Sequence, residues 1–315
     1  GSEMCIRDRL CGKKLRRKKK MVSSKEFFFG CASFSILLVN TLLLALLMIP
    51  LGIIKFLIPI KALRVSFTKI IIKIGEAWIS INSLWVKNLL NPNIEIVGFE
   101  SLNKNEWYLT TSNHQSWADI FVVQELTNKK IPMLKFFMKH VLVYVPVIGI
   151  CWWALDMPFL KRYTKEQIKK NPQLQGRDFK EMRKSLNHYS LHPVSVFSYA
   201  EGTRFTKEKH TKQNSPFKNL LKPKEGGMAL ALSVIPSINF LIDITIIYES
   251  PKRSFWDYLC GRLKNIKVFV KKRHIPEIFL NEMLAEDDIL RMKFKEWINE
   301  IWKEKDELIS STNFN

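Results

Sequence analysis

Residues 107–120, Trp-Tyr-Leu-Thr-Thr-Ser-Asn-His-Gln-Ser-Trp-Ala-Asp-Ile, decide how this chain folds. The first five residues are aromatic and β-branched, which is typical of a short strand over 107–111. A Ser-Asn pair then supplies turn and cap chemistry, and apolar residues recur afterwards at helical spacing, which predicts a helix over 116–126. His114 therefore lies where a strand passes into a helix, a common position for a functional side chain in an α/β protein.

Asp119 follows His114 by five residues. On a regular helix this spacing is about 500° of rotation, so the two side chains would not share a face. They pair well if His114 lies on the incoming turn and leans over the first helical turn. The carboxylate would then accept the imidazole N–H, fix the tautomer and stabilise an imidazolium. The alternative is an ordinary loop histidine beside a solvated aspartate.

A second stretch, Glu201-Gly202-Thr203-Arg204, follows a strand predicted over 194–199. Gly202 lets the backbone approach an anion closely, Thr203 offers a hydroxyl, and Arg204 offers a bidentate guanidinium. The combination suits a phosphate group. Taken alone, it is equally a turn that carries an arginine.

The two motifs together resemble one family. Asn-His-(four residues)-Asp followed by Glu-Gly-Thr-Arg is similar to the glycerophospholipid acyltransferases, the 1-acylglycerol-3-phosphate acyltransferase family. Phe159-Leu160-Lys161-Arg162 resembles the second block of the family and Val234-Ile235-Pro236 the fourth, so the resemblance spans residues 90–250. The run from Glu201 to Thr206, continued by residues 215–227, is similar to the subgroup shared by one bacterial branch and the eukaryotic lysophosphatidate and lysocardiolipin acyltransferases. Ala200, where many members have proline, agrees with this subgroup.

The resemblance implies an α/β fold with a mixed, largely buried β-sheet flanked by helices. It implies that His114 is a general base, oriented by Asp119. The activated hydroxyl of 1-acyl-sn-glycerol-3-phosphate would attack the thioester of acyl-CoA or of acyl carrier protein, giving phosphatidic acid. No metal and no other cofactor is required by this mechanism. Around the glycerophosphate of the acceptor the resemblance places Glu201, Gly202, Thr203, Arg204 and Arg162.

Three other functions are alternatives to this acyl transfer. The acceptor could be another lysophospholipid, such as lysophosphatidylglycerol or lysocardiolipin, in phospholipid remodelling. A nucleic-acid-binding protein is disfavoured, because no aromatic-interleaved basic module is apparent and a long apolar run would be unexplained. An inactive membrane scaffold is disfavoured because every residue of both motifs is present.

The charge balance indicates an anionic partner. The chain has 50 Lys and Arg against 29 Asp and Glu, a net charge of +21, which favours a nucleic acid, an anionic membrane surface or a phosphorylated substrate. Residues 1–20 hold nine of these basic residues and two acids. We interpret them as a non-native or disordered leader. The five cysteines show no paired spacing, so neither a disulfide framework nor a zinc site is indicated.

Residues 27–54 contain no charged side chain, and about 20 apolar residues suffice to span a bilayer. A single span, a re-entrant helical hairpin and a removed signal peptide compete here. We favour a membrane-embedded hairpin or one span that continues into a helix on the bilayer surface. The predicted division is 1–20 leader, 21–90 membrane helices, 91–275 catalytic domain and 276–315 amphipathic tail. The predicted location is the cytoplasmic (inner) membrane, with the active site on the cytoplasmic side.

The remaining pattern predicts further elements of the catalytic domain and tail. They are strands over 95–99, 157–162 and 240–248, an edge strand over 268–271, a helix plus a hydrophobic loop over 133–154, and helices over 175–189, 225–232 and 280–309.

Overall fold

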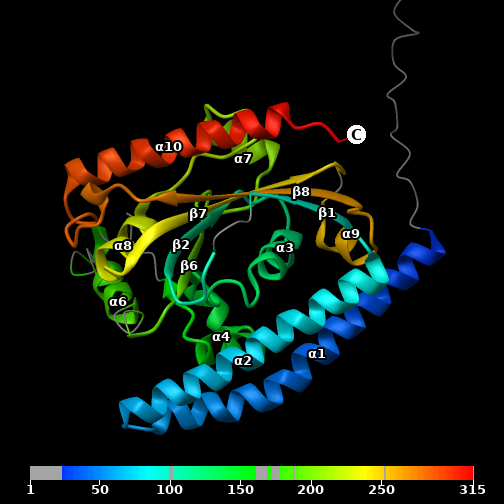
Figure 1. Ribbon diagram of the computed structural model, residues 1–315, viewed down its shortest axis with the longest axis horizontal. Helices are drawn as coiled ribbons and strands as arrows, with labels where there is room; N and C mark the ends of the chain where they lie inside the picture. The colour runs from blue at the N-terminus through cyan, green and yellow to red at the C-terminus, as the bar shows by residue number, and fades with distance from the viewer. Residues whose placement is uncertain are drawn as a thin grey trace, which may run out of the picture.

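A mixed β-sheet lies at the centre of the computed structural model, which describes residues 23–98, 102–160, 169–171, 173, 177–186, 189, 191–251 and 253–314 (Figure 1). The order of its strands is β1-β8-β7-β2-β6-β3. The four neighbouring strands β7, β2, β6 and β3 are parallel to one another. Strand β8 is antiparallel to β7. The predicted α/β fold with a mixed sheet and flanking helices is confirmed. The strands are β1 (Asn93–Val97), β2 (Trp107–Ser112), β3 (Leu134–Phe136), β6 (Ser195–Tyr199), β7 (Ile238–Tyr248) and β8 (Asn265–His274), and a small second sheet pairs β4 (Met138–Lys139) with β5 (Phe159–Leu160).

Helices cover both faces of the sheet. Figure 1 shows α10 above it and α3 with the N-terminal helices below it. Successive residues of a strand point to opposite faces, so Leu109 of β2 packs toward α8 and α10 while Tyr108 packs toward α3 and α9. The helices are α1 (Ser24–Leu57), α2 (Lys61–Trp85), α3 (Ala118–Thr127), α4 (Ile148–Ala154), α6 (Arg177–Leu186), α7 (Lys207–Gln213), α8 (Gly226–Val234), α9 (Phe255–Leu259) and α10 (Asp288–Ser311), with a π-helix η1 (Val86–Leu90) and 3-10 helices η2 (His140–Tyr144) and η5 (Glu277–Phe279).

Helices α1 and α2 form a long hairpin that lies along the domain (Figure 1). Polar side chains join the two helices: Asn40 donates to Asn82 at 2.9 Å, and the Trp78 indole donates to Thr41 at 3.1 Å. In the described part of the chain, one helix, α1, is long and apolar enough to cross a membrane, with a mean hydropathy of 2.5. Helix α1 runs unbroken through Pro50 and Gly52, so the apolar stretch itself does not fold back, and the return arm of the hairpin is α2, the stretch expected on the bilayer surface. The position of both helices in a bilayer stays a prediction.

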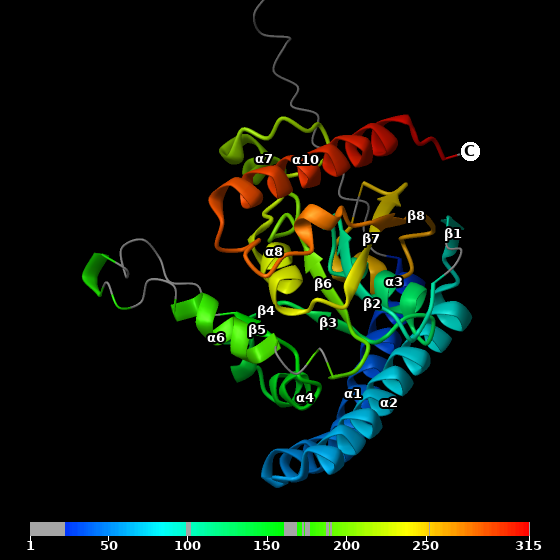
Figure 2. The same cartoon turned by 60° about the vertical axis from the view of Figure 1, so that its left-hand side comes forward.

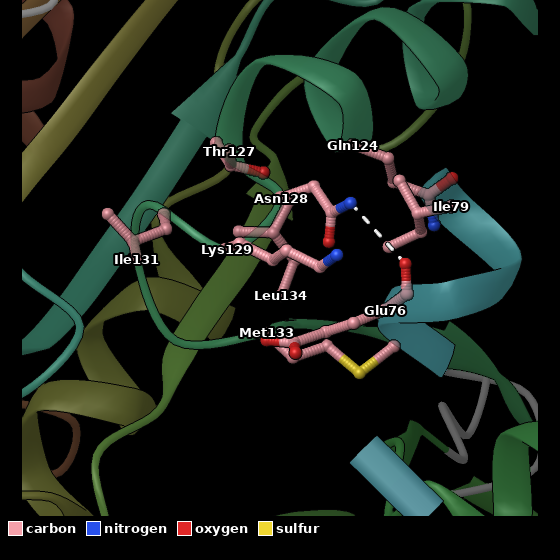
Figure 3. Close-up of a pocket in the computed structure, with 9 residues that line it drawn as sticks. All are labelled: Glu76, Ile79, Gln124, Thr127, Asn128, Lys129, Ile131, Met133 and Leu134. Atoms are coloured by element: carbon pink, nitrogen blue, oxygen red, sulfur yellow. Dashed lines mark hydrogen bonds between the residues drawn. The ribbon is translucent and has the colours of Figure 1, made fainter. Parts of the chain in front are cut away.

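The hairpin also contacts the loop after α3. Figure 3 shows a small pocket at this joint, in which the Asn128 amide donates to the main-chain oxygen of Glu76 at 3.4 Å. The pocket has a volume of about 10 Å³, which is space for roughly one water molecule. It is a packing defect between α2 and the domain and not a ligand site.

Helix α10 is an integral part of the sheet packing. Phe294, Ile298, Ile301 and Trp302 are buried on the side that faces the sheet. The Lys305 ammonium, 2% exposed, donates to Asp243 at 2.5 Å and to the main-chain oxygen of Ile244 at 2.7 Å. The helix predicted over 280–309 is present but begins only at Asp288, and its apolar face is covered by the sheet and not, as had been expected, directed at a membrane.

Two sequence predictions were wrong. The segment over 268–271 was expected at an edge, but it belongs to β8, which lies between β1 and β7. Residues 133–154 were expected as a helix plus a loop, yet they begin with β3, which extends the main sheet beside β6. Short apolar runs do not distinguish strands from helices by periodicity alone.

We expect Lys305→Ala to destabilise the domain. Removing one partner of a buried ion pair costs about 3–5 kcal/mol, and we expect the lower end because Arg273 still contacts Asp243 at 3.3 Å. Chemical denaturation of the purified protein measures the loss. The control is Lys303→Ala on the exposed side of α10, which should cost within about 0.5 kcal/mol. Equal effects of the two changes would contradict the structural role of Lys305.

Candidate active site

Three parallel strands end at one edge of the sheet. Ser112 at the end of β2 is the register partner of Tyr199 at the end of β6, and β7 runs parallel to β2 on its other side and ends at Tyr248. Ligands of open α/β sheets bind outside the carboxyl ends of such strands. The segments that follow β2 and β6 are the two motifs that the sequence singled out.

His114 and Asp119 are in contact, as predicted. His114 lies on the turn between β2 and α3, and Asp119 lies in the first turn of α3. The distance from His114 Nδ1 to Asp119 Oδ2 is 2.9 Å. Because a carboxylate only accepts hydrogen bonds, Nδ1 carries the proton and Nε2 is left as the acceptor of the ring. His114 is 8% exposed and Asp119 is fully buried.

The Asp119 carboxylate is held by three further donors. Oδ2 accepts the main-chain N–H of Gln115 at 2.6 Å and of Ser116 at 2.9 Å, and Oδ1 accepts the Tyr248 hydroxyl at 2.6 Å. Burial, together with the charge of Asp119, raises the pKa of Tyr248 well above its usual range, so this hydroxyl remains a donor. The carboxylate therefore stays in one orientation toward the histidine.

The turn that carries His114 is fixed on both sides. The Asn113 side chain pairs with β7: its amide donates to the Ile246 oxygen at 2.9 Å and accepts the Ile246 N–H at 2.8 Å. The ring of Tyr199 stacks on that of His114, with 3.9 Å between centroids and 14° between planes. Asn113 thus shapes the turn, as predicted, and Tyr199 limits the rotation of the imidazole.

Glu201 joins the two motifs from inside the protein. Its carboxylate is fully buried and accepts the main-chain N–H of His114 and that of Leu221, each at 2.9 Å. Burial is the largest influence and raises the pKa of Glu201 to about 7, against the lowering effect of these two bonds. A main-chain bond of 2.7 Å from Phe205 to the His114 oxygen ties the motifs a second time.

The rest of the second motif faces outward. Gly202 has φ +68°, which glycine adopts readily, and a Cβ added there would lie 3.5 Å from the Lys224 ammonium. Thr203 Oγ1 accepts from Lys209 at 2.7 Å, which leaves the threonine O–H free to donate to a ligand. The Arg204 guanidinium lies 4.9 Å from the centre of a Trp117 ring.

A cavity of about 920 Å³ opens at this edge of the sheet. Its polar lining includes His114, Gly202, Thr203, Arg204 and Lys224. Its apolar lining comes mainly from β3 and the segment that follows it, and includes Phe136, Phe137, Val141 and Leu142. The cavity therefore suits an amphiphile with an anionic group.

The structure brings most of the predicted site residues together. His114, Gly202, Thr203 and Arg204 line the cavity, and Asp119 lies behind His114. Glu201, predicted to contact the acceptor, instead directs its carboxylate at two main-chain N–H groups. Arg162 lies outside the described residues.

Sequence reasoning missed two groups. Tyr248 is the last residue of a strand that was predicted, but its contact with Asp119 depends on that strand running parallel to β2. Lys224 was one of six lysines in a basic run, and only the fold shows that its side chain lies across Gly202. Among the described residues, no group of three or more His, Cys, Asp or Glu side chains could hold a metal ion.

Comparison with known proteins agrees with the fold and with the class of the domain. Residues 93–248 match the family model for acyltransferases. A crystal structure of the 1-acyl-sn-glycerophosphate acyltransferase from Thermotoga maritima superposes with a TM-score of 0.55 and 16% sequence identity, covering 94% of this chain and all of that one. This likeness shows the same fold.

Curated relatives point to one family. A 2-acyl-1-lysophosphatidylinositol acyltransferase from Saccharomyces cerevisiae is 33% identical over 37% of this chain and 32% of its own length. The delta form of 1-acyl-sn-glycerol-3-phosphate acyltransferase from Bos taurus is 27% identical over 55% of this chain and 43% of its own length. The chain thus spans less than half of the curated relatives it matches.

The chain carries an acyltransferase domain. The resemblance to the 1-acylglycerol-3-phosphate acyltransferase family that the sequence indicated is confirmed by this match and by these relatives.

The buried carboxyl of Glu201 makes stability depend on pH. Its pKa in the folded protein, about 7, is above the ordinary value of 4.5, so the folded state binds more protons between these values and loses stability as pH rises through the window. Relative to Glu201→Gln, which cannot titrate, we expect the unfolding free energy of the wild type to fall by up to about 1.4 kcal/mol per pH unit there. Denaturation curves from pH 4.5 to 8 measure it. The control is Glu208→Gln, at an exposed position on α7, whose unfolding free energy should change with pH as that of the wild type does. If the unfolding free energy of Glu201→Gln also followed the wild type, the raised pKa of Glu201 would be refuted.

Proposed function

We propose that this protein transfers a fatty acyl group from acyl-CoA or acyl carrier protein to the free hydroxyl of 1-acyl-sn-glycerol-3-phosphate. The products are phosphatidic acid and a free thiol. The observation that carries the proposal is the pair of His114 and Asp119, joined at 2.9 Å beside a cavity of about 920 Å³. The acyltransferase family of the domain supports the reaction class.

His114 acts as the general base. With Nδ1–H held by Asp119, Nε2 takes the proton of the acceptor hydroxyl as its oxygen attacks the thioester carbonyl. The new C–O bond forms, the C–S bond breaks, and the thiolate leaves with the electron pair of that bond. The imidazolium returns its proton to the thiolate, and Asp119 stabilises the positive ring in the meantime. General-base help of this kind contributes about 10²–10⁴ in rate.

Arg204 and Lys224 bind the phosphate of the acceptor. Both line the cavity and both are exposed, so neither is committed to a buried ion pair. The Thr203 hydroxyl and the open backbone at Gly202 complete an anion site. Glu201 has a positioning role, because it fixes this turn to the turn of His114 without entering the cavity.

A second candidate keeps the mechanism and changes the acceptor. The yeast relative is named for lysophosphatidylinositol, and lysophosphatidylglycerol and lysocardiolipin carry the same type of phosphate. Arg204 and Lys224 would recognise any of them through the phosphate they share.

Helix α1 attaches the enzyme to a membrane. Its outward side chains are apolar over several turns, among them Leu43, Leu46 and Leu47, each more than half exposed. Acceptor and product are amphiphiles, so a site at the headgroup plane avoids transferring a lipid into water. The basic residues of the chain would add about 1 kcal/mol each when close to an anionic surface. We place the protein in the cytoplasmic membrane with the site on the cytoplasmic side.

Thiol release from acyl-CoA tests the function. We expect release by the membrane-bound protein to require lysophosphatidic acid, and His114→Ala to lower the rate about 10²-fold or more. Alanine leaves the main-chain bonds of residue 114 to Glu201 and Phe205 in place, so folding should persist. His274→Ala, on an exposed part of β8, serves as the matched control.

Parallel assays separate the alternatives. Release that needs another lysophospholipid changes the acceptor but keeps His114 in its role. If no thiol is released from acyl-CoA, acyl carrier protein is tested as the donor. The absence of thiol release with both donors and every acceptor, or near-normal turnover by His114→Ala, would overturn the proposal.

Arg204→Ala should raise the KM for the phosphorylated acceptor. A hydrogen bond to a charged group contributes about 1.5–3 kcal/mol, so we expect a rise of about 10-fold or more with little change in the KM for the acyl donor. Lys207→Ala, exposed and outside the cavity lining, is the control. Steady-state kinetics with both substrates varied decides the matter. A change confined to the donor would show that Arg204 does not bind the acceptor phosphate.

A further inference from the structure

The wall of the cavity continues into an apolar surface segment, residues 140–150, which we call the lip. It comprises η2, a short connection and the start of α4. Tyr144 is 73% exposed, Val141 65% and Ile150 42%. Residues 141–155 contain no charged side chain. Large apolar side chains gathered on one exposed segment mark an interaction surface.

The exposure of the lip is built into its backbone. Gly149 donates to the Val145 oxygen at 2.8 Å, and Val145 donates to Leu142 at 3.2 Å. A Cβ at Gly149 would lie 2.2 Å from the Val143 oxygen, so main chain occupies the inside of the segment. The apolar side chains cannot turn inward without breaking these contacts.

Helix α4, whose first residues belong to the lip, packs against helix α1 through its last residues. The rings of Phe56 and Trp153 lie 5.6 Å apart, and Gly52 packs directly on Ala154. Phe56 is 66% exposed and Leu57 71%, so the apolar end of α1 adjoins α4. Figure 2 shows α4 beside the hairpin at this position.

Two lysines beside the lip are buried and point away from its surface. Lys55 of α1 is 5% exposed and donates to the Ala154 oxygen at 2.6 Å and to Asp156 at 2.8 Å. Lys135 of β3 is 1% exposed and donates to the Leu155 oxygen at 2.6 Å. Both ammonium groups therefore donate to the C-terminal end of α4 from inside the protein and do not reach the surface of the lip.

We propose that the lip inserts into the same bilayer leaflet as the Phe56–Leu57 end of α1 and brings the mouth of the cavity into contact with membrane lipid. His140, Val141 and Leu142 of the lip line the cavity together with His114. An apolar chain could therefore pass from the leaflet into the cavity along the lip. The inference rests on the proposed transfer between amphiphiles, and its occupant is the lipid bilayer.

Tyr144 and Ile150 test the lip, because neither lines the cavity. We expect Tyr144→Asp and Ile150→Asp to raise the KM about 10-fold for lysophosphatidic acid in phosphatidylglycerol vesicles. For a short-chain acceptor below its critical micelle concentration, kcat/KM should stay within about twofold. Tyr144→Phe should retain wild-type activity on vesicles. Ile289→Asp on α10, an exposed isoleucine in another part of the fold, should alter neither reaction. Equal losses with both acceptors, or no loss on vesicles, would overturn the proposal.

A second measurement does not depend on turnover. A benzophenone amino acid at position 144 should cross-link to phosphatidylglycerol in vesicles on illumination, and one at position 289 should not. A protein–protein adduct from position 144, showing a second copy of the chain on the lip, or no lipid adduct at all, would overturn the proposal. This result stands even if the wild type proves inactive with every acceptor, so failure of the proposed function and failure of the lip are distinguishable.

Discussion

The Glu201 carboxylate is the interaction on which the site depends. It accepts main-chain N–H groups from His114 and Leu221, segments that are 87 and 20 residues away in the sequence. A buried carboxylate is costly unless its oxygens are bonded, and here each oxygen has a main-chain donor. Because the donor at His114 is the main-chain N–H, the bond to Glu201 does not occupy the imidazole, which lines the cavity. Burial raises the pKa of Glu201, and the charge of the buried Lys305 on helix α10 opposes this rise.

Local order around His114 was predictable because it is encoded locally. An aromatic and β-branched run followed by Ser-Asn and a helical pattern indicated the strand, the turn and the helix. The five-residue spacing allowed a contact of His114 with Asp119 only if the histidine lies on the turn, and the structure places it there. The direction of Glu201 was not predictable, because a side chain at the end of a strand can face either the ligand or the interior. The positions of the His114 and Leu221 N–H groups decide it, and both depend on the tertiary fold.

The sheet order required information that a linear pattern lacks. β8 has a mixed apolar and basic composition, which resembles an exposed edge, yet it lies between β1 and β7. Its lysines and arginine find acids on other elements: Lys272 contacts Glu106 at 2.9 Å, and Arg273 contacts Glu304 at 2.6 Å. Cross-element ion pairs of this type let a basic strand occupy the interior of a sheet. Tyr248 was missed for a related reason, since its contact with Asp119 follows from the pairing of β7 with β2.

The net charge of +21 overstates what the surface offers to an anionic partner. Three lysines are 5% exposed or less: Lys55, Lys135 and Lys305. Their ammonium groups donate hydrogen bonds to main-chain oxygens or to acidic side chains inside the protein. Burial lowers the pKa of Lys135 to about 8, which shows how far desolvation opposes its charge. Arg204 and Lys224 differ, because both are exposed at the cavity. Cations are thus buried beside the lip and exposed beside the turn of Gly202. This division would separate the apolar part of an amphiphile from its headgroup, as the proposed transfer to a lysophospholipid requires.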